Sequence, residues 1–325
     1  MTRPADTPGS PDAPPRMLRV DRASAGRRLD VFLAERLGLS RAQVRRLLGR
    51  GSVEVAGRTA QERDKGRSLA EGEELAVAPY RAPAEERVLA EPDLPLQIVA
   101  RGEGWLAADK PPGMAMHPYE EGETGTLLGA VVARHPEVQG VGEGGLRSGI
   151  VHRLDVDTSG VVLVATEQAC WQRLRQAFQE HRVEKQYRAV VAGRVEASGE
   201  ADVGVCMARH RPAKVRVVDE AERASARGVW PVRMTWSPLE VRDDSTLLEV
   251  RPETGFLHQI RVVLASAGHP LLGDRTYAPP KIAARAPRHL LHATSIRHAE
   301  ILALGDVPFS CFLTVGEKAR KSNVP

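Results

Sequence analysis

The hydrophobic positions near the N-terminus follow the spacing of two short helices. One apolar stripe recurs every three or four residues and ends at Gly38, a residue type that commonly ends helices. This stripe consists of Leu29, Phe32, Leu33 and Leu37. Ser40 and Gln43 form a capping-box pattern, which predicts the start of a second helix. Short strands predicted at 52–55 and 74–77 complete a small unit.

From residue 96 onward, short apolar runs and alternating apolar and polar residues indicate a strand-rich region. These patterns predict strands at 96–100, 105–109, 161–165, 182–193, 247–251 and 290–296, with further alternation over 229–250. Helical spacing predicts helices at 126–135, 170–178 and 256–267. The basic stretch 199–219 is interpreted as a partly irregular excursion.

Length and composition indicate a soluble protein of two domains. The chain has 325 residues and a hydrophobic content of 42%. Residues 1–16 are rich in proline and small polar residues and are predicted to form a disordered tail, followed by a domain at 17–78. The Pro- and charge-rich stretch 79–95 is predicted to link it to a domain at 96–325. No apolar run approaches the roughly 18 residues of a membrane span, and the N-terminus lacks a signal-peptide pattern, so we expect a cytoplasmic protein.

The residues that usually bind metals or nucleotides do not occur in the required patterns. The three cysteines are Cys170, Cys206 and Cys311, and their wide spacing predicts neither a disulfide framework nor a zinc site. The glycine-rich stretch 140–145 lacks both the P-loop ending and the dinucleotide fingerprint. We therefore expect no metal and no cofactor.

Positive charge is concentrated in the first predicted domain. Residues 22–67 contain 12 lysines and arginines and 5 acidic residues, a net charge of +7, whereas the whole chain carries +4. Arg41, Arg45 and Arg46 lie on or beside the polar side of the second predicted helix. Such a patch is typical of a surface that contacts a polyanion, with RNA phosphates the expected partner. The alternative is a basic helix pair that only keeps the protein soluble.

A dense polar cluster precedes the apolar run 161–165. Residues 149–165 read GIVHRLDVDTSGVVLVA, which places His152, Arg153 and Asp155 in a loop before a buried strand. A loop on a rigid strand can aim side chains precisely. The alternative is that the polar residues only form a salt-bridged turn.

Arg261 occupies an apolar position on the predicted helix at 256–267, four residues after Leu257. A guanidinium group on a buried face requires a carboxylate partner. The pattern thus predicts a nearby buried acid, and Asp155 is the candidate. An arginine partner would keep a partly buried carboxylate ionised and oriented.

Several segments together resemble one enzyme family. HRLD followed by TSG, the segment WLAADKPPGMAMHP, Lys185-x-Tyr187 and ETGFLHQIRVVLASAGHPLLGDRTY resemble the RluA-type pseudouridine synthases. RLDVFLAERLGLSRAQVRRLLGRGSVEVAG resembles the RNA-binding domain named after ribosomal protein S four. Two positions depart from these patterns: Ala56 stands where Asn is usual, and Phe256-Leu257 where Arg-Thr or Arg-Ser is usual.

The resemblance implies an α+β fold, with a small α/β basic N-terminal domain and a catalytic domain on a mixed, mainly antiparallel sheet. It implies that the chain isomerises uridine to pseudouridine in structured RNA without a cofactor. Asp155, Tyr187 and Arg261 would be the catalytic residues, with Tyr187 stacking on the target base. Arg153 and His152 would be RNA- or base-binding residues: Arg153 would fill the space that the base leaves, and His152 would hold the loop rather than react. The RNA is expected to be ribosomal rather than transfer RNA, and the protein a monomer.

Two alternatives of other classes remain open at this stage. One is a catalytically idle ribosome-assembly factor of the same fold, which intact Asp155, Tyr187 and Arg261 disfavour. The other is a nucleoside or glycoside hydrolase that uses Asp155 and Asp157. Two carboxylates so close in one turn are poorly placed to flank a bond from opposite sides. Whether Asp155 attacks the sugar or assists a deprotonation is also left open.

Overall fold

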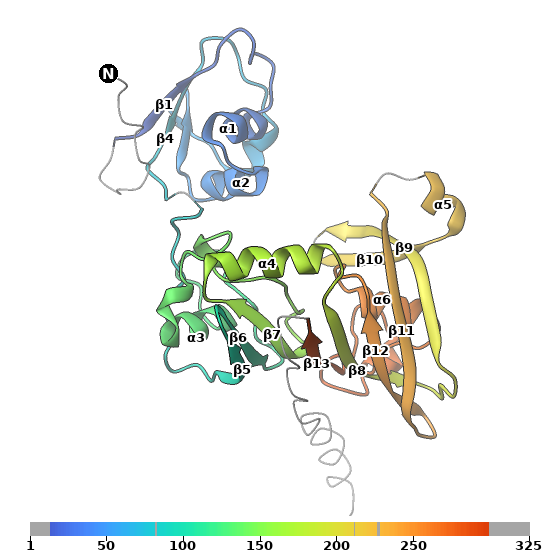
Figure 1. Ribbon diagram of the computed structural model, residues 1–325. Coiled ribbons are helices and arrows are strands. Elements are labelled where there is room, and N and C mark those ends of the chain that lie inside the picture. The colour runs from blue at the N-terminus through green and yellow to red at the C-terminus, as the bar shows by residue number, and fades with distance from the viewer. Residues whose placement is uncertain (1–13, 82, 211, 226–227, 299–325) are drawn as a thin grey trace, which may run out of the picture. The chain divides into compact units, whose positions relative to one another are not determined.

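The computed structural model describes residues 14–298 apart from 82, 211 and 226–227 (Figure 1). The chain forms two compact units, Met1–Glu86 and Arg87–Pro325. The predicted tail lies outside the described residues up to position 13, and Cys311 lies outside them as well. Arg16, the last residue of the predicted tail, already belongs to a strand.

The boundary between the units falls inside the predicted linker 79–95. From Arg87 onward, however, this stretch packs on the second unit. Val88 is buried in a core of that unit, and the Glu91 carboxylate accepts a hydrogen bond of 2.8 Å from the backbone N–H of Gly125. Only the first part of the segment therefore connects the two units.

The first unit packs two helices against one antiparallel sheet. Its elements are β1 (Arg16–Arg19), α1 (Leu29–Leu37), α2 (Arg41–Gly49), β2 (Val53–Val55), β3 (Arg58–Thr59), a 3-10 helix (Glu62–Gly66) and β4 (Glu74–Val77). The sheet order is β1-β4-β2-β3. The predicted apolar stripe lies in the core, together with the inward side of α2.

Local sequence signals explain where these helices and turns occur. The capping box is confirmed: the Ser40 hydroxyl accepts from the Gln43 N–H, and the Gln43 side chain accepts from the Ser40 N–H at 2.6 Å. Gly38 ends α1 with a φ of 67°. Ala56 and Gly57 join β2 to β3 with φ of 50° and 73°, as in a two-residue type I′ hairpin turn. The left-handed φ explains why asparagine suits position 56 better than alanine.

The second unit is built on one nine-stranded sheet. Its strands are β5 (Gln97–Gly102), β6 (Trp105–Lys110), β7 (Ser159–Ala165), β8 (Glu184–Ala192), β9 (Gly199–His210), β10 (Ala213–Val218), β11 (Trp230–Val241), β12 (Ser245–Pro252) and β13 (Leu291–Arg297). The order is β10-β9-β11-β12-β8-β13-β7-β6-β5. Among the described strands of this sheet, only β13 and β7 pair in parallel, so the prediction of a mixed, mainly antiparallel sheet is confirmed.

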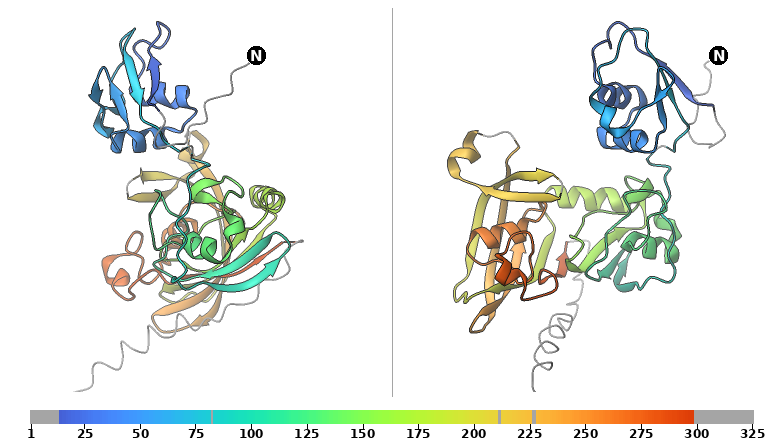
Figure 2. Two further views of the ribbon diagram at one scale, coloured as in Figure 1. Left: turned by 90° about the vertical axis from the view of Figure 1, so that its left-hand side faces the viewer. Right: turned by 180° about the vertical axis from the view of Figure 1, so that it is seen from behind.

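Helices cover this sheet on both faces. The α-helices in the described part of this unit are α3 (Leu127–Arg134), α4 (Gln168–Gln179), α5 (Glu220–Ser225), α6 (Gln259–Ser266) and α7 (Pro280–Ala283), of which α3, α4 and α6 pack on the sheet. Alternate residues of β7 face two different cores: Val162 and Val164 pack with α3, while Val161 and Leu163 pack with α4. α6 covers the other half of the sheet, over β11 and β12 (Figures 1 and 2). Among the described residues, no helix combines the length and apolarity needed to span a membrane.

Two predictions for the second unit were wrong. Most of the stretch 199–219 is the antiparallel hairpin of β9 and β10, and its irregularity is limited to one register shift between Lys214 and Val215 among the described residues. Its charged residues point outward from an edge of the sheet, which obscures the alternation of buried valines in the sequence. The predicted helix at 256–267 begins at Gln259, because His258 has a left-handed φ of 55° and residues before it form a turn.

Candidate active site

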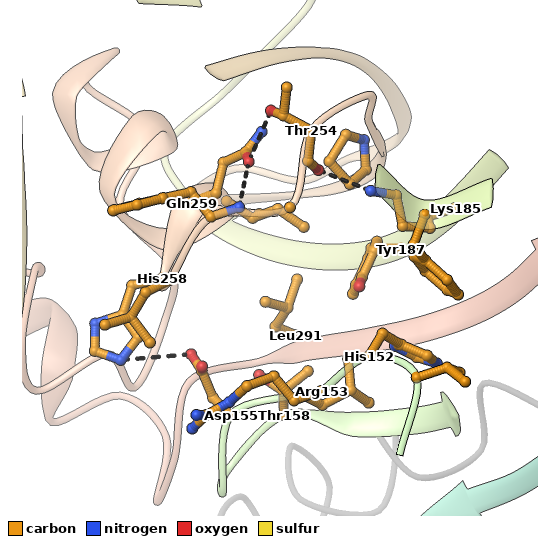
Figure 3. Close-up of a pocket in the computed structure, with 18 of the residues that line it drawn as sticks. His152, Arg153, Asp155, Thr158, Lys185, Tyr187, Thr254, His258, Gln259 and Leu291 are labelled. Atoms are coloured by element: carbon orange, nitrogen blue, oxygen red, sulfur yellow. Dashed lines mark hydrogen bonds and ion pairs between the residues drawn. The ribbon is translucent and has the colours of Figure 1, made fainter. Parts of the chain in front are cut away.

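A cavity of about 520 Å³ opens on one face of the sheet, between the part covered by α3 and the part covered by α6. Tyr187 of β8 packs against both of these cores and so marks the border between them. Four segments supply most of its lining: the polar loop at 150–158, the end of α4 with the residues that follow it, β8, and the turn that leads into α6 with the first turn of that helix. Figure 3 shows that the loop and the turn face each other across this space.

Asp155 and Arg261 meet at the cavity, as the sequence predicts. Nη1 of Arg261 donates a hydrogen bond of 2.9 Å to Oδ2 of Asp155, although 106 residues separate them in the chain. The Arg261 side chain is 7% exposed and that of Asp155 is 19% exposed. Asp155 therefore presents an oriented carboxylate to the cavity while its counter-charge remains buried.

The principal partner of Arg261 is Asp274, which the sequence analysis missed. Nε and Nη2 of Arg261 donate to the two carboxylate oxygens of Asp274 at 2.8 and 2.9 Å. Burial lowers the pKa of Arg261, but hydrogen bonds and charge from Asp274, with charge from Asp155, outweigh it and leave the pKa raised. A side chain at Gly273 would overlap the carbonyl oxygen of Arg288, so glycine is required beside this acid. The segment HPLLGDRTY, in which Asp274 follows Gly273, could have pointed to this acid.

His258 also faces Asp155, and it too was absent from the predicted site. Its Nε2 lies 3.8 Å from Oδ2 of Asp155, and its Nδ1 lies 2.8 Å from the hydroxyl of Tyr277. The Tyr277 hydroxyl accepts from the Val215 N–H, and its ring lies 5.2 Å from the Arg261 guanidinium. Burial lowers the pKa of His258, while the charge of Asp155 partly opposes this. A neutral His258 adds no positive charge to the one that Arg261 brings to the Asp155 carboxylate.

Tyr187 and Lys185 project from β8 into the cavity (Figure 3). Burial, and then the charge of Asp155, raises the pKa of Tyr187, so its hydroxyl stays protonated near neutral pH. The ring is thus available for stacking and the hydroxyl for donating a hydrogen bond. Lys185 donates a hydrogen bond of 2.7 Å to the carbonyl of Thr254, and burial lowers its pKa to about 8.

Three cations hold the backbone of the polar loop. Lys110 is wholly buried, and its Nζ donates to the carbonyls of Pro111, Met114 and Val156 at 2.8–2.9 Å. Arg175 donates to the carbonyl of Val151, and Arg288 to that of Asp157. Lys110 therefore ties the loop at Val156 to the turn at 111–114, and its buried ammonium group does not face a ligand. Such support from outside the site keeps Asp155 in one position.

Three histidines also hold the polar loop and the start of β7 in position. Nε2 of His152 accepts a hydrogen bond of 2.9 Å from the Leu163 N–H, so this residue holds the loop as predicted. The hydroxyls of Thr158 and Ser159 lie 2.8 and 2.9 Å from ring nitrogens of His289 and His292. A side chain at Gly160 would overlap the Ala293 carbonyl, which explains the glycine at the close approach of β7 and β13.

The other predicted residues of the polar loop differ in their exposure to solvent. Arg153 and His152 both line the cavity, but Arg153 is exposed, whereas His152 is half-buried beside Phe178, with ring centroids 4.8 Å apart. Asp157 is exposed, and it is not one of the described residues that line the cavity. This arrangement offers one cavity carboxylate from the loop, which disfavours a hydrolase that uses Asp155 and Asp157 as a pair.

Comparison with known proteins assigns the chain to a family. A family profile described as RNA pseudouridylate synthase matches residues 104–266, which include the polar loop, β8 and Arg261. A protein of Chloroflexus aurantiacus named as an uncharacterized RNA pseudouridine synthase is 35% identical over 292 residues, covering 87% of this chain and 85% of that protein. The chain belongs to the RNA pseudouridylate synthase family.

Two further proteins extend this assignment. The ribosomal large subunit pseudouridine synthase D of Neisseria meningitidis serogroup B is 34% identical over 266 residues, covering 81% of this chain and 67% of that protein. Human RNA pseudouridylate synthase domain containing 1 has the same fold, with a TM-score of 0.54 and 24% identity over 66% of this chain and 83% of that chain. The family profile and the relatives above 30% identity together make the protein an RNA pseudouridine synthase.

The arginines predicted to bind RNA in the first unit of this synthase have different surroundings. Arg41 is tied to the buried carboxylate of Asp30 at 3.1 Å, and Arg28 holds the same acid at 3.0 Å. The Arg41 side chain is still 54% exposed. Arg45 and Arg46 are half-buried on α2. Asp30 thus fixes part of the basic surface to the fold without covering it.

Because His289 and His292 are buried behind the polar loop, we expect the synthase to lose stability in mild acid. Burial lowers the pKa of His289 and of His292 to about 4, below the usual value near 6.5 of an unfolded chain. As the pH falls below 6.5, the unfolded chain therefore takes up protons that the folded protein does not. Each histidine should lower the free energy of unfolding by about 2 kcal/mol at pH 5 relative to pH 7, measured by urea unfolding.

A substitution tests this assignment. His289→Gln should reduce the difference between pH 7 and pH 5 by about 2 kcal/mol, because one titrating group is removed. His210→Gln, at an exposed histidine, is the matched control against which the change in His289→Gln is compared. An unchanged pH dependence in His289→Gln would show that another group is responsible.

Proposed function

We propose that this synthase isomerises specific uridines of structured ribosomal RNA in the cytoplasm, using Asp155 and no cofactor. The observation that carries the proposal is the carboxylate of Asp155, which reaches the cavity while Arg261 fixes it from beneath. The relative from Neisseria is named for the large ribosomal subunit, which supports ribosomal RNA as the substrate. Transfer RNA is the competing substrate.

The reaction requires three changes in the nucleotide. The bond from the ribose to uracil nitrogen one breaks, the base turns, and a new bond joins the ribose to ring carbon five. Carbon five loses its proton and nitrogen one gains a proton, so the product is an isomer. Asp155 acts either as a nucleophile on the sugar or as a base, and both roles use the ionised carboxylate that Arg261 orients.

The target uracil has to leave its helix or loop to reach Asp155. Tyr187 lies at the border of the two cores and lines the cavity, which supports the proposal that its ring stacks on the everted base. Arg153 is exposed at the cavity, which supports the proposal that it occupies the space that the base vacates in the RNA. Unstacking costs a few kcal/mol, which these contacts offset.

The alternative is an assembly factor that binds RNA without acting on it. The contact of Asp155 with Arg261 and the position of Tyr187 in the same cavity favour catalysis. The test uses ribosomal RNA labelled with tritium at carbon five of its uracils. The synthase should release tritium and leave pseudouridine at one or a few sites. RNA binding without tritium release from ribosomal or transfer RNA would favour the idle factor, and free uracil would indicate a hydrolase.

The first unit is proposed to be an RNA-binding domain of the type named after ribosomal protein S four. Deleting residues 17–78 should weaken RNA binding and flatten its dependence on salt, because phosphate contacts release counterions. Replacing Arg41, Arg45 and Arg46 together by glutamine should lower the slope of log Kd against log salt by about 2 to 3. The measurement is a filter-binding titration at several salt concentrations. Unchanged affinity across the salt range in both variants would contradict the proposal.

A further inference from the structure

A pair of stacked aromatic rings lies at the edge of the active-site cavity. The rings of Trp230 and Phe256 have centroids 5.0 Å apart and an angle of 28° between their planes. Phe256 lines the cavity, and the Trp230 residue is 44% exposed. The mechanism above uses neither residue. We call this pair the aromatic shelf.

Both residues of the aromatic shelf are held by the fold. Trp230 begins β11 and pairs with Val205 of β9. The Phe256 N–H donates a hydrogen bond of 3.0 Å to the side chain of Gln259. Trp230 alternates in register with Val232 and Met234, which face the α6 core, so it lies on the face of the sheet that bears the cavity. The shelf is therefore a fixed aromatic surface continuous with the active site.

We propose that the aromatic shelf stacks an unpaired nucleobase that neighbours the target uridine in the RNA. The proposal rests on the proposed function, because it requires an RNA whose uridine enters the cavity. Eversion of one nucleotide disturbs the stacking of its neighbours, which leaves a flanking base available. Exposed aromatic rings beside a nucleic-acid site commonly supply such a surface.

The chemistry of the shelf favours a base over a phosphate. The two rings of the shelf carry no charge, so the shelf offers a nucleobase a stacking surface and offers a phosphate no cation of its own. Stacking involves no release of counterions, and its contribution is largely independent of salt. We thus expect the shelf to act on the base next to the target and to influence which uridines are accepted.

The test is a binding titration with a fluorescein-labelled RNA hairpin that carries in its loop a uridine modified by the wild-type enzyme. All variants contain Asp155→Asn, which prevents turnover. Trp230→Ala should weaken binding roughly tenfold, whereas Trp230→Phe should stay within about twofold because a ring remains. Leu239→Ala is the matched control, since Leu239 lies on the same strand and is 49% exposed. It should bind like the parent.

A second arm identifies the group that the shelf contacts. An abasic site at the flanking nucleotide should weaken binding to the parent about tenfold and add little in Trp230→Ala, because the two changes remove one contact. Phe256→Arg should lose this sensitivity and steepen the slope of log Kd against log salt by about 0.7.

The outcomes separate the shelf from the proposed function. Equal binding by Trp230→Ala and the parent overturns the shelf even if the wild type makes pseudouridine. A change in oligomeric state by light scattering, with RNA affinity unchanged, also overturns it and identifies a protein contact. If the wild type modifies no RNA, the proposed function fails. In that case, titrations of the same variants with single-stranded oligouridylate test whether the aromatic shelf stacks a nucleobase.

Discussion

Asp155→Asn is expected to reduce pseudouridine formation by at least about 10⁴-fold, the scale seen when a central catalytic group is removed. Asparagine has nearly the shape of aspartate, and its carbonyl oxygen can still accept the hydrogen bond from Arg261. The substitution therefore removes the charge, and with it both the nucleophile and the base, while leaving the contact. Tritium release from labelled RNA under single-turnover conditions measures the effect.

The control for this variant is that its fold and its RNA affinity persist. Arg261 keeps its two hydrogen bonds to Asp274, so no buried charge is left without a partner. The midpoint of urea unfolding should stay close to that of the wild type, and Kd for RNA should change by less than about threefold. Wild-type turnover by Asp155→Asn would exclude this carboxylate from the chemistry.

Asp274→Ala should destabilise the protein by about 3–5 kcal/mol and also abolish most activity. The substitution removes both carboxylate oxygens that hold the buried guanidinium of Arg261, and breaking one side of a buried ion pair costs this much. Arg261 then has Asp155 as its remaining carboxylate partner and is free to move with it. Urea unfolding measures the stability, and single-turnover tritium release measures the activity of the folded fraction.

Two further variants test whether the effect of Asp274→Ala comes from the buried ion pair: one at a surface ion pair, and one that removes both buried charges. Asp244 pairs with Arg285 at 2.8 Å, but its side chain is 74% exposed, so Asp244→Ala should cost less than about 1 kcal/mol. Replacing Arg261 by methionine together with Asp274 by leucine should recover much of the lost stability, because neither buried charge remains. It should not recover activity, since Asp155 loses the group that orients it. Full activity in Asp274→Ala would show that Arg261 needs no such support.

The elements whose signals are local could be predicted from the sequence. The capping box of Ser40 and Gln43 formed as expected, because it requires only residues three apart. The run after the polar loop became β7, which is buried on both faces and therefore reads as continuous apolar sequence. One long-range contact was also predictable: a guanidinium in the apolar stripe of a helix implied an acid, and Asp155 was the acid in the most polar loop.

Other features depended on tertiary contacts that leave little local pattern. The sequence of this chain by itself determined the polar loop, its strand, the buried arginine and the basic N-terminal unit. Only the folded chain decided that Asp274 is the main partner of Arg261, that Lys110 holds the loop backbone, and that Trp230 meets Phe256. Periodicity reports which side of an element is buried, whereas these pairings depend on how separate elements approach one another.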